Sequence, residues 1–202
     1  KPLFVILNGE DIEIFGEALS YSETLNITKG QENQYFEQFA KEHPRREQAL
    51  SAWVYLEKIY TSDSLFAFQK TPNQAIQKEK QRIKAEGALF LSKLPKDSYV
   101  SWFLPTRKLV SSVSTIAQYR PKEIPATVSA FREIDYTDNR LYKSGLFKDA
   151  IESHFWLLEN CGKPLDSVFV EMQFSIDAML IPLKKDEQKL NEVTDYLFDV
   201  LE

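Results

Sequence analysis

The spacing of apolar residues changes along this chain from an alternating pattern to a helical one. Apolar residues cluster at positions 2–7 and alternate at 11–14, on either side of Asn8-Gly9. An Asn-Gly pair between two such segments predicts a β-hairpin, and residues 25–28 predict one more short strand. A lone hairpin is barely stable in water, so these strands need a partner sheet or helices that pack against them. We therefore expect residues 1–30 to be the end of a β-rich domain, in an excerpt from a longer protein.

From residue 31 onward apolar residues recur at the three- and four-residue spacing of amphipathic helices. Residues 120–125 contain two prolines and predict a loop, and Pro105 predicts a kink or a restart within its helix. His43-Pro44 predicts the end of the first helix. The sequence thus predicts a mainly α fold, an irregular multi-helix bundle at residues 31–202 behind the short β-hairpin. The predicted helices span residues 35–43, 49–60, 71–94, 99–119, 126–133, 147–160, 167–180 and 186–201.

Composition narrows the class of protein. The chain has 202 residues, of which 43% are hydrophobic and 13% aromatic, as expected for a packed domain. Its net charge of -5 argues against binding to nucleic acid, which requires a basic face. No apolar run approaches the roughly 18 residues of a membrane span.

Catalytic and cofactor motifs are absent from the sequence. None of the glycines forms a phosphate-binding pattern or a nucleophile elbow. Cys161 is the single cysteine, which excludes an internal disulfide, a CxxC pair and a cysteine-rich zinc site. We therefore predict that this chain is not itself an enzyme and that it holds no cofactor and no metal.

The remaining polar candidates have simpler structural interpretations. His43 is expected to cap a helix end, and His154 and Cys161 to pack, because two ligands two helical turns apart do not form a zinc site. Asp135, Asp138 and Asn139 resemble the start of a calcium loop but lack its glycine and closing glutamate. We expect Asp138 to cap a helical turn and Asp135 to bind local backbone amides.

Several segments carry a resemblance to a known family. The sequence IDYTDNRL at residues 134–141, followed by Gly-Leu-Phe at 145–147 and a helical pattern at 150–158, resembles a hallmark stretch of TlpA-type thiol-disulfide oxidoreductases. These are thioredoxin-like proteins of the bacterial cell envelope with a long region ahead of the catalytic domain. Residues 5–14 resemble the last strands of their β-sandwich, and residues 28–36 their transition into helices.

The resemblance implies a non-catalytic accessory module whose parent carries the CxxC pair in a separate thioredoxin-like domain. Such a module would space the redox domain, or bind substrate or partner proteins, in the periplasm or anchored to the outer membrane as part of a lipoprotein. No catalytic residue is carried over, since Cys161 matches no catalytic position.

Two other readings stay open at this point. The chain is alternatively a stand-alone helical domain that binds a protein or peptide, with Trp102, Phe103 and Trp156 as candidate interaction residues in an exposed aromatic groove. A third hypothesis is a metal-dependent enzyme built on Asp135, Asp138 and His154.

Overall fold

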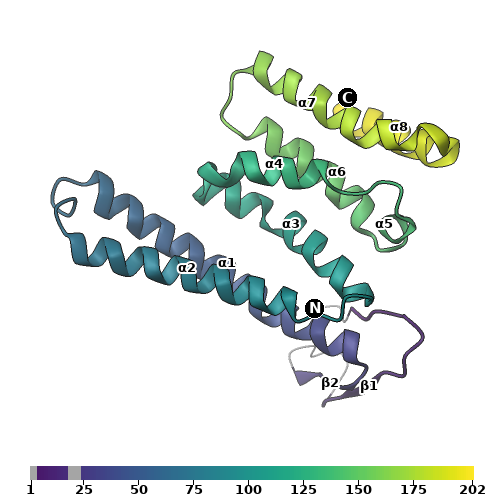
Figure 1. Ribbon diagram of the computed structural model, residues 1–202, viewed down its shortest axis with the longest axis horizontal. Coiled ribbons are helices and arrows are strands. Elements are labelled where there is room, and N and C mark those ends of the chain that lie inside the picture. Colours follow the sequence, from purple (N-terminus) through teal and green to yellow (C-terminus); the bar gives the residue numbers. More distant parts are fainter. Residues whose placement is uncertain (1–3, 18–23) are drawn as a thin grey trace. The chain divides into compact units, whose positions relative to one another are not determined.

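The computed structural model describes residues 4–17 and 24–202 (Figure 1). In these residues the chain forms eight α-helices and a single pair of short strands, so the predicted mainly α class is confirmed. The elements are β1 (Glu13–Phe15), β2 (Asn26–Lys29), α1 (Gln31–Ser62), α2 (Lys70–Ser92), α3 (Tyr99–Tyr119), the 3-10 helix η2 (Pro121–Glu123), α4 (Ile124–Arg132), α5 (Asn139–Lys143), α6 (Leu146–Glu159), α7 (Leu165–Leu180), the 3-10 helix η3 (Ile181–Lys185) and α8 (Glu187–Leu201).

Contacts within the chain divide it into two compact units, residues 1–105 and 106–202. The division falls inside α3, directly after Pro105. Each unit has its own buried side chains, and each is described by itself below. The boundary predicted after residue 30, and the origin of the strands in a β-sandwich, stay predictions.

In the first unit α1 and α2 lie side by side as a long helical hairpin (Figure 1). The Glu57 carboxylate on α1 pairs with Lys80 and accepts a hydrogen bond from Gln77, both on α2. Near the other end of this hairpin is an apolar core. Its buried members are Phe39, Leu94, Val100 and Leu104, with Tyr35, Phe36, Phe90 and Phe103 packed around them.

The strands pair differently from the sequence prediction. β1 is antiparallel to β2, with Ile14 opposite Ile27, whereas residues 4–7 form no strand. The side-chain amide of Asn33 occupies both backbone groups of Ile6, so that segment does not pair with a neighbouring strand. Gly9 does turn the chain at a φ of 90°. The predicted turn at Asn8-Gly9 is thus present, but the hairpin around it is wrong, and its residues 2 and 3 lie outside the described residues.

Carboxylates distant in sequence cap two helices of this unit. Both carboxylate oxygens of Glu10 accept hydrogen bonds at the start of α1, from the backbone N–H groups of Gln31 and Glu32 at 3.1 Å. Glu32 in turn accepts from the N–H groups of Tyr99 and Val100, at 3.2 and 3.1 Å, at the start of α3. A negative charge there also interacts favourably with the helix dipole.

Pro44 does not end the first helix as the sequence predicted. α1 continues through Pro44, so the predicted end at His43-Pro44 and the capping role of His43 are wrong. His43 is buried mid-helix and its ring stacks on Phe39 at 4.7 Å. Phe39, His43 and Leu50 form one buried stripe on both sides of the proline, and its burial offsets the roughly 3 kcal/mol cost of an internal proline. α3 likewise continues through Pro105.

The second unit contains α4 to α8 and the C-terminal part of α3. Its core is built from fully buried aromatic and aliphatic side chains, among them Phe131, Tyr136, Ile151, Phe155, Leu157, Met179 and Leu183. The predicted loop at 120–125 is shorter than expected, because η2 and the first turn of α4 occupy most of it. Gly162 has a left-handed conformation after α6, at a φ of 73°. No helix in the described part of the chain has the length and apolar character to cross a membrane.

Candidate functional site

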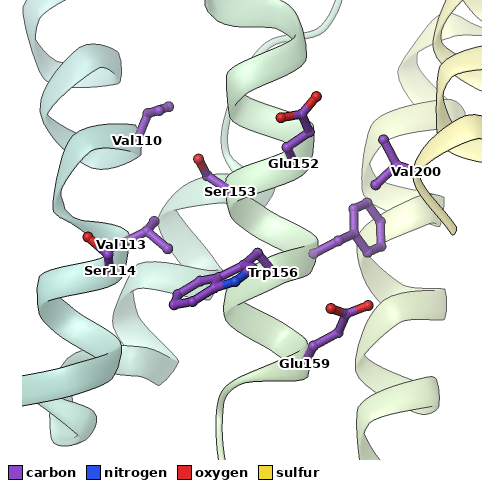
Figure 2. Close-up of a pocket in the computed structure, with 9 residues that line it drawn as sticks. Val110, Val113, Ser114, Glu152, Ser153, Trp156, Glu159 and Val200 are labelled. Atoms are coloured by element: carbon purple, nitrogen blue, oxygen red, sulfur yellow. The ribbon is translucent and has the colours of Figure 1, made fainter.

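A pocket of about 470 Å³ lies in the second unit, between α3, α6 and α8 (Figure 2). Its central side chains come from α6, where Glu152, Trp156 and Glu159 are spaced four and three residues apart. This spacing places the three on one face of the helix. The Trp156 indole extends toward the α3 residues Val113 and Ser114, with a carboxylate on either side of it along α6 (Figure 2).

The floor of the pocket is apolar and its rim is polar. Val113 and Phe155 line it and are buried, while Ser114 and Ser153 contribute hydroxyls. Val200 on α8 closes one side. A cavity of this size with an apolar floor and a few polar groups has the dimensions of a small-ligand site.

The charges in this pocket are negative. Glu152 and Glu159 are its charged lining residues, and no salt bridge to either is formed within the described residues. Glu152 accepts a hydrogen bond from the Tyr196 hydroxyl. Desolvation, followed by this hydrogen bond to Glu152, raises the pKa of Tyr196 to about 12. Tyr196 therefore stays a neutral donor at physiological pH.

Trp156 is the one predicted interaction residue that lines this pocket. Its indole is 43% exposed and stacks on no other ring or cation within the described parts of the chain. Trp102 and Phe103 belong to the first unit, where Phe103 packs against the apolar core and both rings contact Tyr99. The three candidates therefore do not belong to one compact unit.

His154, beside the pocket residues in sequence, points into the core instead. It is fully buried between Phe131 and Phe155, and its Nε2 lies 3.1 Å from the Ser175 hydroxyl. Arg132 donates to the same hydroxyl at 3.0 Å, and Ser175 donates to the Glu171 carbonyl. Serine next to histidine resembles a nucleophile with its base, but both side chains are 0% exposed and no substrate reaches them.

The structure does not assemble the predicted metal alternative. Asp138 caps α5 by accepting from the Arg140 N–H at 2.8 Å, and Asp135 accepts from the Thr137 N–H at 2.8 Å, which confirms their expected local roles. Residues 4–17 and 24–202 contain no group of three or more acidic, histidine or cysteine side chains placed to hold a metal ion. Cys161 is partly buried at the end of α6.

An exposed apolar face on α7 was missed by the sequence analysis. Five large side chains on it are between 55% and 67% exposed: Leu165, Phe169, Val170, Phe174 and, at the first position of η3, Ile181. At about 100° per residue, Val170, Phe174 and Ile181 project on the side away from the face that buries Val168, Ser175 and Met179, whereas Leu165 and Phe169 project beside that buried face. We call these five residues the α7 outer face. The signal was present in the sequence, since the large apolar residues of α7 are spread over more than one side of the helix, and a single packed face cannot bury them all.

No family model matches this chain, and no match is found among curated proteins or solved structures. Its function is therefore inferred from its own residues.

Proposed function

We propose that this chain is a non-catalytic protein-binding module and that the α7 outer face is its recognition surface. The observation that carries this proposal is the exposure of five large apolar side chains on one helix. Together they present on the order of 600 Å² of apolar surface, at the upper end of patches on monomers. One partner's share of a standard protein interface is about 800 Å². The face is therefore large enough to be the centre of an interface.

Charge indicates the chemistry of the partner. Asp166 and Asp177 are exposed on α7 beside the apolar side chains, whereas the nearby lysines lie beyond the ends of the helix. Residues 146–202 contain twelve acidic and five basic side chains. An amphipathic helix with an apolar stripe and basic flanks is complementary to such a face in shape and in charge.

A second copy of the chain fits this face less well. Two copies of α7 related by a perpendicular two-fold axis run antiparallel, and the register that places Phe169 opposite Phe174 also places Asp166 opposite Asp177. Like charges at that position oppose pairing, particularly at low salt. The proposal therefore commits to a different, basic partner.

The test uses a model helix of leucine and lysine with the leucines at three- and four-residue spacing. Its matched control carries glutamate in place of lysine. Fluorescence anisotropy of the labelled peptides with the full chain should give saturable binding of the basic peptide and much weaker binding of the acidic one. Phe174→Ser should lower the affinity for the basic peptide about tenfold, since truncating a central aromatic anchor costs more than about 1 kcal/mol of binding free energy.

Phe68→Ser is the matched control variant, because Phe68 is 88% exposed but lies in the first unit. It should leave peptide affinity unchanged. Equal loss in both variants, or no loss in Phe174→Ser, would overturn the proposal. Sedimentation equilibrium showing a dimer that Phe174→Ser dissociates would also overturn it, in favour of self-association.

We also propose a parent for the module, an envelope thiol-disulfide oxidoreductase of the TlpA type. This rests on the resemblance at residues 5–14, 28–36, 134–141, 145–147 and 150–158. The coding sequence on both sides of the segment tests it. A lipid-attachment signal upstream and a thioredoxin-like CxxC downstream are expected, and a frame that ends near residue 202 would leave a stand-alone binding protein instead.

A further inference from the structure

We propose that the pocket around Trp156 binds a linear organic cation with ammonium groups at both ends, of the polyamine class. This inference is independent of the α7 outer face. It rests on the charge, the spacing and the aromatic surface of the pocket residues.

The charge of the pocket selects a cation. Glu152 and Glu159 both line it, and neither forms a salt bridge within the described residues. Two exposed carboxylates on one helix, without a cationic partner among the lining residues, produce a local negative potential that favours a cation. An anion is excluded on the same ground.

The spacing of the carboxylates selects a long ligand with two charges. Glu152 and Glu159 are seven residues apart on α6, which is about 10.5 Å along the helix axis. Trp156 lies between them on the same face (Figure 2). An extended alkyl chain with a terminal ammonium group at each carboxylate spans this distance and passes beside Trp156, whose indole is directed toward α3 (Figure 2).

The walls of the pocket favour an organic cation over a bare metal ion. The Trp156 indole has no ring or cation partner in the described structure, and an ammonium group or the methylenes next to it gain from contact with such a surface. Val113 and Phe155 offer an apolar bed for the alkyl chain. A metal ion would need several oxygen ligands converging on one point, and a separation of two helical turns does not provide them.

The test is calorimetric titration of the full chain with spermidine, followed by putrescine, which is shorter, and octylamine, which has one charge. Spermidine should bind at one site per chain, about tenfold more tightly than either of the others, because each keeps at most one of the two charge contacts. Binding should weaken as salt is raised, as expected for exposed charges.

Three variants identify the site. Glu159→Gln and Trp156→Leu should each lower the affinity for spermidine about tenfold. Trp156→Phe keeps an aromatic face and should lower this affinity less. Glu133→Gln is the matched control, since Glu133 is an exposed carboxylate of the same unit that does not line the pocket. Circular dichroism verifies that each variant is folded.

Equal affinities for spermidine in Glu159→Gln and Glu133→Gln would show non-specific ionic binding and overturn the proposal. If spermidine gives no heat of binding and also leaves the tryptophan fluorescence unchanged, the proposal is overturned as well. The two proposals fail separately, because Phe174→Ser should leave spermidine binding intact and Glu159→Gln should leave peptide binding intact.

Discussion

The environment of His154 makes the stability of the second unit depend on pH. Its imidazole is fully buried, stacked on Phe131 at 5.0 Å, and its Nδ1 atom has no hydrogen-bond partner among residues 4–17 and 24–202. Desolvation by burial, and secondarily the positive charge of Arg132, lowers the pKa of His154 to about 3. The folded unit thus resists protonation of this ring, whereas the unfolded chain accepts the proton near pH 6.5.

The magnitude follows from the difference between the two pKa values. Because the folded-state pKa is depressed, the unfolded state binds more protons between pH 6.5 and 3. The contribution is therefore fully present above pH 6.5 and is lost progressively as the pH falls toward 3. Between pH 7 and pH 5 this single group should lower the free energy of unfolding by about 2 kcal/mol.

Urea unfolding at pH 7 and pH 5 measures this effect against His154→Leu, which removes the titrating group and keeps an apolar side chain of similar size. Trp156 reports on the second unit once Trp53 and Trp102, both in the first unit, are replaced by phenylalanine. Comparing the pH dependence of the two proteins cancels the carboxylates that titrate in both. Between pH 7 and pH 5, the free energy of unfolding of His154→Leu should fall by about 2 kcal/mol less than that of its parent.

An equal loss of stability in the two proteins would refute this reasoning. It would mean that His154 titrates with an ordinary pKa and is not buried among Phe131, Phe155 and Ser175. His154→Gln provides a second comparison, since it keeps a polar group that does not titrate. It should show the same reduced pH dependence as the leucine variant, and a dependence as steep as the parent's would assign the effect to another group.

Two further predictions concern helix caps. Asp138→Ala should destabilise the second unit by about 1 kcal/mol, because the Arg140 N–H loses its hydrogen-bond acceptor, whereas Asp138→Asn should retain most of the stability. Urea unfolding midpoints at constant m-value test this prediction, and equal midpoints for the two variants would argue against a capping role. Glu32→Ala should destabilise the first unit by about 1–2 kcal/mol, because the N–H groups of Tyr99 and Val100 at the start of α3 lose their acceptor. Trp102 fluorescence during urea unfolding measures the stability of this unit, and an unchanged midpoint would contradict the contact.

The sequence alone determined most of the helical segments. The segments predicted at 71–94, 147–160, 167–180 and 186–201 correspond closely to α2, α6, α7 and α8. Local chemistry also predicted the Asp138 cap. These features depend on interactions within a few residues, so the amino-acid pattern contains them. It also pointed to Trp156, although not to the carboxylates beside it.

Tertiary contacts decided the rest. The partner of β1, the passage of α1 through Pro44 and the carboxylate caps of α1 and α3 depend on groups up to 68 residues apart, such as Glu32 and Val100. The pocket exists because α3, α6 and α8 are brought together around Trp156. The α7 outer face is exposed because the unit covers one side of that helix and leaves the other open. Spacing along the chain shows that a helix is apolar, but only the packed structure shows which of its faces is buried.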